Sequence, residues 1–259
     1  MNFGPMTEPD GFTEDAFLGG QLRLRQPKAG HRAGHDAMLL AAATAARPGD
    51  RIADFGAGVG AAGLAVAKRV PETEIVLIEI DQALAALARD NAASNAIVAD
   101  IVAMDITAGA AAFAAAGLPP DGFDVVLMNP PFNETRRHRS SPDKNRARAH
   151  IADATTLEAW IRAARRILKT GGVLTLIWRA DALSEVLAAL KPGFGSVTIL
   201  PVHGNASTPA IRVLVRAIKG GRAPMALHPG LMLNDESGLP NKQLQEILAG
   251  RATLPLARL

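Results

Sequence analysis

Residues 51–60 read RIADFGAGVG, and this stretch decides the fold. Its first half is a short apolar run of the kind that forms a buried strand. Gly56, Gly58 and Gly60 then allow a tight turn and let a ligand approach the backbone closely. The alanine-rich stretch 61–69 continues as a helix. A strand, a glycine turn and a helix in this order predict a ligand site at the first strand of an α/β fold.

Apolar strands and amphipathic helices alternate outward from this unit. Further strands are expected at residues 74–80, 101–104, 123–128, 173–178, 196–202 and 211–216. Nearly continuous apolar strands separated by helices are typical of parallel sheets that are covered on both faces. We therefore predict an α/β, Rossmann-like fold with a seven-stranded, mostly parallel sheet and helices on both of its faces.

The chain has no internal repeat and no low-complexity linker that would indicate a second domain. We expect residues 1–49 to form an N-terminal extension and a helix that cover the ligand site. Residues 50–218 should form the core, and residues 219–259 a C-terminal tail packed on it. Residues 1–20 contain several glycines and prolines, and most of them are expected to be irregular.

Two helix starts are predicted from capping residues. Asp36 is placed to cap a helix that begins at Ala37, and it has a second interpretation as one wall of a cofactor pocket. Thr155, with Glu158 three residues later, has the pattern of a capping box. We expect a helix to begin there.

The composition limits the class of protein. The chain has 259 residues, 48% of them hydrophobic, and a net charge of +3, which indicates a globular protein. It contains no cysteine, which excludes disulfides and thiolate metal sites, and no metal site is predicted. The N-terminus is acidic, unlike a secretory signal, and the alanine-rich run 106–118 is too short to cross a membrane. We expect a cytoplasmic protein.

Three carboxylates should lie around the glycine turn, because the carboxyl ends of parallel strands meet at one edge of the sheet. Glu79, at the end of the second strand, can bind ribose hydroxyls, and Asp105, after the third, can accept a bond from an adenine amino group. Asp54 would oppose a dinucleotide's pyrophosphate but suits the cationic amino acid part of S-adenosylmethionine. S-adenosylmethionine is the expected cofactor; NAD and a purely structural turn are the alternatives. The expected cofactor-binding residues are Asp36, Asp54, Gly56, Gly58, Gly60, Glu79 and Asp105.

The fourth strand delivers Asn129, Pro130, Pro131 and Phe132 to the same edge of the sheet. The two prolines lack backbone N–H groups and stiffen the chain. The side-chain oxygen of Asn129 and the carbonyl of Pro130 can then accept hydrogen bonds from one amino group, and Phe132 can stack on a flat substrate. This arrangement favours methyl transfer to a planar, exocyclic nitrogen, and we predict these four residues to be catalytic.

The ordered set of motifs resembles class I methyltransferases of the small-methyltransferase-domain type. Segments ahead of the core, Leu18–Gly20, Gln26–Lys28 and Gly34–Leu40, are similar to those of bacterial tRNA N6-adenine methyltransferases. The resemblance implies methylation of the adenine beside the anticodon of valine tRNA. Release-factor glutamine methyltransferases and guanine N2 methyltransferases share the Asn-Pro-Pro-aromatic motif. A small-molecule amine acceptor and a non-catalytic RNA-binding or NAD-binding protein also remain open.

A basic run follows Phe132 and bears on the partner. It comprises Arg136, Arg137, Arg139, Lys144, Arg146 and Arg148. Beside the target pocket, these side chains can contact phosphates, and binding should weaken as salt rises. A solvated loop is the ordinary alternative for such a run. The short segment 1–49 leaves little room for the helical domain of release-factor enzymes, so RNA, and tRNA in particular, is the expected partner.

Overall fold

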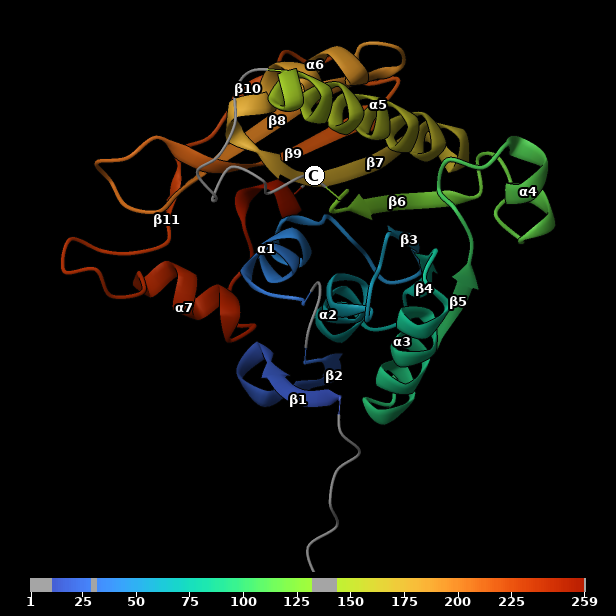
Figure 1. Ribbon diagram of the computed structural model, residues 1–259, viewed down its shortest axis with the longest axis horizontal. Coiled ribbons are helices and arrows are strands. Elements are labelled where there is room, and N and C mark those ends of the chain that lie inside the picture. The colour runs from blue at the N-terminus through green and yellow to red at the C-terminus, as the bar shows by residue number, and fades with distance from the viewer. Residues whose placement is uncertain (1–10, 29–31, 132–143, 259) are drawn as a thin grey trace, which may run out of the picture.

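The computed structural model describes residues 11–28, 32–131 and 144–258, and it describes the side chains of all of these except residues 144–153. Its centre is a nine-stranded sheet in the order β10-β8-β9-β7-β6-β3-β4-β5, with β11 paired to β8 (Figure 1). The strands are β3 (Arg51–Phe55), β4 (Glu74–Glu79), β5 (Ala99–Ala103), β6 (Phe123–Met128), β7 (Leu168–Arg179), β8 (Phe194–His203), β9 (Ala210–Lys219), β10 (Ala226–Leu227) and β11 (Leu231–Met232).

The predicted α/β class with a mostly parallel sheet is confirmed. Strands β3 to β7 are parallel to one another, and β9 is antiparallel to both β7 and β8. Strands β3 to β9 account for the seven expected strands. The count differs because β10 and β11, two residues each, add to β8 from the C-terminal tail. Such short pieces carry too little periodicity to be recognised in a sequence.

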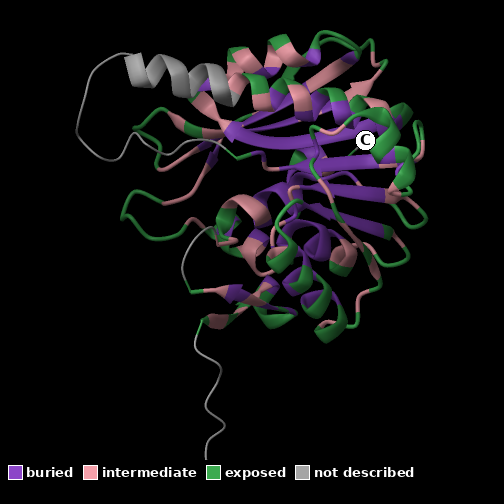
Figure 2. Cartoon of the chain, turned by 45° about the vertical axis from the view of Figure 1, so that its right-hand side comes forward, coloured by how far each residue is buried: buried purple, intermediate pink, exposed green. Residues whose placement is uncertain are grey.

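Helices cover both faces of the sheet and produce two hydrophobic clusters, which Figure 2 shows as buried strands between helical layers. The helices are α1 (His35–Ala43), α2 (Ala61–Arg69), α3 (Gln82–Ser94), α4 (Ala110–Ala115), α5 (Lys144–Ile167), α6 (Leu183–Leu190) and α7 (Lys242–Leu248). Side chains of α1, α2, α3 and α7 pack on one face. Those of α4, α5 and α6 pack on the other.

Three local predictions are wrong. Residues 12–17 form β1 (Phe12–Phe17), which pairs with β2 (Leu22–Pro27) in a hairpin, where irregular chain was expected. Helix α1 begins at His35 with Gly34 as its N-cap, so Asp36 lies in the first turn and does not cap it. Helix α5 begins at Lys144, which places Thr155 inside it. Short polar side chains occur both at caps and within helices, and tertiary packing overrides the local preference.

The C-terminal tail packs on the face that carries α1. Leu244 and Ile247 of α7 are buried in the same cluster as α1. Leu254 N donates to the carbonyl of Ala42 at 2.9 Å, and a nitrogen of the Arg216 guanidinium donates to Leu256 O at 2.9 Å. Within the described part of the chain, no helix combines the length and apolar character needed to span a membrane.

Candidate active site

The glycine turn joins β3 to α2 with one side packed and the other open. Gly56 and Gly58 have positive φ angles of 65° and 57°, a region that disfavours side chains. A Cβ atom on Gly56 would lie 2.4 Å from Cη2 of Trp160, which comes from α5. A Cβ atom on Gly58 would meet nothing within 4 Å. The turn is therefore supported by the indole of Trp160 and accessible at Gly58.

Asp54 supports the turn from inside the fold. Its side chain is buried, and Oδ2 accepts a hydrogen bond from Gly63 N at 2.8 Å, which ties the first turn of α2 to β3. Burial raises the pKa of Asp54 to about 7, against the hydrogen bond from Gly63, and the charge of Glu79 raises it further. The contact shown for Asp54 is thus to the backbone of α2, and its predicted effect on a ligand would act through this network.

Two further carboxylates lie at the carboxyl ends of strands, Glu79 in β4 next to β3, and Asp105 after β5, two strands from β3. Glu79 accepts hydrogen bonds from Gly58 N at 2.8 Å and from Asp81 N at 2.9 Å. Asp105 follows the neighbouring strand, where it accepts from Thr107 N at 2.7 Å. The sequence reasoning missed Ile80, which directly follows Glu79 and is 65% exposed. The signal that the sequence offered for Ile80 was an isoleucine directly after a carboxylate that ends an apolar strand.

Asn129 directly follows β6, the strand that neighbours β3. Its Oδ1 atom is buried and has no hydrogen-bond partner among the described residues. Pro130 is buried and Pro131 is exposed. Phe132 lies outside the described residues. An unsatisfied buried acceptor costs about 1–3 kcal/mol, so a donor from outside the described residues would stabilise this oxygen.

The predicted basic run is only partly described. Arg136, Arg137 and Arg139 lie outside the described residues. Lys144, Arg146 and Arg148 fall in the first turns of α5, outside the range of described side chains. A phosphate-binding role for this run stays a prediction.

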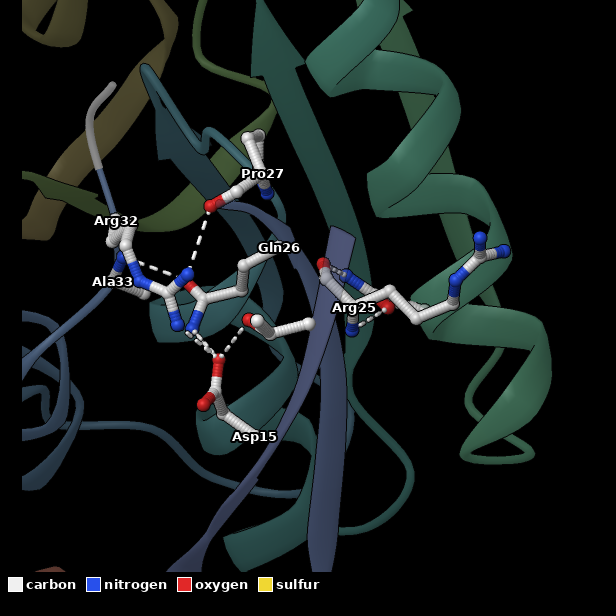
Figure 3. Close-up of polar contacts among 8 residues, drawn as sticks. Asp15, Arg25, Gln26, Pro27, Arg32 and Ala33 are labelled. Carbon is white, nitrogen blue, oxygen red and sulfur yellow. Dashed lines mark hydrogen bonds and ion pairs between the residues drawn. The ribbon is translucent and has the colours of Figure 1, made fainter. Parts of the chain in front are cut away.

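A polar network fixes the hairpin to the segment that enters α1 (Figure 3). Gln26 is buried; its Nε2 donates to Asp15 at 2.8 Å, and its Oε1 accepts from Ala33 N at 2.7 Å. Arg32 donates to the same Asp15 oxygen at 2.6 Å and to Pro27 O at 2.9 Å. These contacts set where α1 begins.

Asp36, near the start of α1, lies apart from the glycine turn. Its Oδ2 contacts Nε of Arg212 on β9 at 2.9 Å. Strand β9 lies beyond β7, on the side of β6 that faces away from β3. The structure thus brings the glycines, Glu79, Asp105 and Asn129 to one edge of the sheet, while Asp36 of α1 pairs with Arg212 on β9, two strands away from β6.

Comparison with known proteins agrees with this geometry. The profile of the family described as "Methyltransferase small domain" matches residues 33–205, which include the glycine turn, both strand-end carboxylates and Asn129. The chain belongs to this family. It is therefore an S-adenosylmethionine-dependent methyltransferase.

Individual relatives of the methyltransferase have different descriptions. A protein of Bacteroides thetaiotaomicron named tRNA1(Val) (adenine(37)-N6)-methyltransferase is 30% identical over 65% of this chain and 68% of its own length. A Ribosomal RNA small subunit methyltransferase C of Pseudomonas syringae is 29% identical over 50% of this chain and 32% of its own. A crystal structure described as a predicted O-methyltransferase from Agrobacterium tumefaciens has 36% identity and a TM-score of 0.70, covering 85% of this chain and 98% of its own.

The residues of the methyltransferase fit its cofactor. The Glu79 carboxylate already accepts a hydrogen bond at the turn and suits ribose hydroxyls, while exposed Ile80 offers an apolar surface to a flat ring. Gly58 leaves open space above its Cα, where a side chain would stand in the way of a ligand. S-adenosylmethionine supplies an activated methyl group on a sulfonium centre.

Proposed function

We propose that this methyltransferase transfers a methyl group to the exocyclic N6 amino group of an adenine in tRNA. The observation that carries the proposal is the buried Oδ1 of Asn129, directly after β6, which has no hydrogen-bond partner in the part of the chain that the structure describes. An amino group that donates to this oxygen would satisfy it. The neighbouring Pro130 carbonyl is a second acceptor for the other N–H.

Two acceptors on one amino group suit a nitrogen whose lone pair is delocalised into a ring. Accepting both N–H bonds favours pyramidal geometry at the nitrogen and directs its lone pair toward the methyl donor. Asn129 and Pro130 therefore orient the nucleophile, and catalysis rests on positioning and on fixed dipoles. The nitrogen becomes acidic once methylated, so the residues need not remove a proton before attack.

The relative positions of the strands support this role. Neighbouring strands lie about 4.8 Å apart, and β6 is paired directly with β3. A cofactor bound over the turn between Gly56 and Gly58, with its ribose at Glu79, would place its methyl group close to Asn129. We propose that Asp54, Gly56, Gly58, Gly60, Glu79 and Asp105 form or support the cofactor site.

The adenine of tRNA as acceptor is supported by the names of relatives such as that from Bacteroides thetaiotaomicron. The basic run after Phe132 would provide phosphate contacts beside the acceptor site. Phe132 would stack on the target base once that base is extruded from the RNA stack. Extrusion of a base costs least in an RNA loop. Other relatives are named for ribosomal RNA methylation or for O-methyl transfer. Methylation of ribosomal RNA or of an oxygen atom is therefore an alternative outcome of the experiment below.

The test is methyl transfer from labelled S-adenosylmethionine to RNA, protein and metabolite fractions, followed by mass spectrometry of tRNA nucleosides. We expect N6-methyladenine in tRNA. Label confined to protein or metabolites, N2-methylguanine, or a methylated ribose oxygen would refute the proposed acceptor.

The role of Asn129 is tested in the same assay. Asn129→Ala should lower the turnover number by about 100-fold or more, since the two acceptors act in the transition state. Binding of S-adenosylhomocysteine should be unchanged. Asn241→Ser is the control, because Asn241 caps α7 and serine can replace it there. Wild-type turnover in Asn129→Ala would show that this side chain does not position the acceptor.

A further inference from the structure

Two arginines lie side by side at the edge of the sheet that carries Asn129. Arg179 ends β7 and is the direct partner of Arg212 on antiparallel β9. Directly opposed residues on antiparallel strands point to the same face. That face is the one under α1, because Ile177 and Leu214, two residues away on each strand, pack in the cluster that contains α1.

A carboxylate orients each arginine through its Nε atom. Arg212 Nε lies 2.9 Å from Asp36 of α1, and Arg179 Nε lies 3.2 Å from Asp181. Nη1 of Arg212 also donates to Ile211 O at 3.2 Å, and because a guanidinium has five N–H donors, these contacts use only part of its donor set. The two side chains are only 12% and 21% exposed for Arg179 and Arg212 respectively, so neither charge is fully screened by water.

Two positively charged side chains that face each other on neighbouring strands repel. Like charges directly opposite each other on neighbouring strands are destabilising. The two carboxylates offset that cost and hold the guanidinium groups in place. A pair of oriented guanidinium forks is suited to an oxyanion with several acceptor oxygens, such as a phosphate group.

The position of the pair separates it from the cofactor. The carboxylates that suit ribose and adenine lie on β4 and after β5, on one side of β6, whereas β7 and β9 lie on the other. Strand β9 is two strands from β6, or roughly 10 Å at the usual spacing. This is within the reach of a nucleotide backbone whose base sits at Asn129.

We infer that Arg179 and Arg212 bind a backbone phosphate of the RNA strand that flanks the target nucleotide, and that Asp36 positions Arg212. The inference rests on the proposed function for its RNA partner. It adds a binding site on β7 and β9 that is separate from the basic run after Phe132. It also accounts for Asp36 without a direct contact to the cofactor.

The test measures equilibrium binding of an unmodified valine tRNA transcript, which requires no methyl transfer. Arg179→Gln and Arg212→Gln should each weaken RNA binding by about tenfold, the usual size of a lost charge-assisted hydrogen bond. The double variant should reduce the slope of log affinity against log salt by roughly 0.7, which is one phosphate on a single strand. Affinity for S-adenosylhomocysteine should not change.

Conservative variants separate binding from folding. Arg212→Lys keeps a charge beside Asp36 but loses the planar fork, so RNA binding should still weaken while the free energy of unfolding changes little. Asp36→Asn should weaken RNA binding by less than Arg212→Gln does. Arg222→Gln removes the same charge from an exposed site after β9, at the opposite edge of the sheet, and is the matched control.

Each result decides one point. RNA affinity and salt slope equal to those of Arg222→Gln would overturn the inference, as would a wild-type chain that does not bind the transcript. Weaker binding of S-adenosylhomocysteine by the same factor would assign the pair to the cofactor instead. Tight RNA binding that depends on the pair, without N6-methyladenine formation, would refute the proposed acceptor and leave the phosphate site standing.

Discussion

Substitution of Gly56 by alanine tests how the cofactor turn is held. The new methyl group would lie 2.4 Å from Cη2 and 3.0 Å from Cζ3 of Trp160, far inside contact distance. The positive φ of 65° adds a backbone cost of about 1–2 kcal/mol for any residue with a Cβ. Overpacking against the indole adds about 1–3 kcal/mol. Gly56→Ala should therefore lower the free energy of unfolding by about 2–5 kcal/mol.

Gly58→Ala is the matched control. Its φ of 57° is nearly the same, but its Cβ would meet nothing within 4 Å. Only the backbone cost of about 1–2 kcal/mol applies there. The difference between the two variants isolates the contact with Trp160.

The assay is urea unfolding followed by far-ultraviolet circular dichroism, which does not depend on tryptophan. In a Trp160→Phe background the smaller ring no longer occupies the space above Gly56, so Gly56→Ala should cost less by about 1–3 kcal/mol. Equal costs for Gly56→Ala and Gly58→Ala, or the same cost of Gly56→Ala in both backgrounds, would refute the argument that α5 supports the turn.

Two further predictions concern the carboxylates. Burial raises the pKa of Asp54 from 3.8 to about 7, so the folded chain keeps a proton that the unfolded chain loses in this range. The associated stability, roughly 4 kcal/mol, is fully present below pH 3.8 and lost as pH rises through about 7. Unfolding free energies of the wild type and Asp54→Asn should diverge across this interval, and parallel curves would contradict the assignment. Glu79→Gln keeps an acceptor for Gly58 N but loses its charge, so S-adenosylhomocysteine binding measured by calorimetry should weaken about tenfold. Unchanged affinity would remove Glu79 from the cofactor site.

The strand-end positions were predictable because their chemistry is local. The run into Gly56, the carboxylate of Glu79 and the Asn129 motif each follow an apolar strand, and parallel strands deliver their carboxyl ends to one edge. Helix α7 (Lys242–Leu248) has local signals at both ends, because Asn241 caps its start and Gly250 follows its end.

Helix starts were harder to predict because caps depend on neighbours. The start of α1 is set by Gln26, Asp15 and Arg32, which lock the hairpin to the incoming chain. None of these contacts has a spacing that a linear pattern reveals. The interpretation of Asp36 as a cap used the residue type alone, whereas its partner, Arg212, lies 176 positions away.

The sequence by itself determined the fold class, the order of the glycine turn and the Asn-Pro-Pro motif, and the cofactor they imply. These follow from periodicity and from backbone conformations that only particular residues adopt. Only the tertiary structure decided that Trp160 lies against Gly56, that Asn129 Oδ1 is buried without a partner among the described residues, and that Arg179 stands opposite Arg212. Those facts depend on strand order and register, which bring together residues that are distant in the chain.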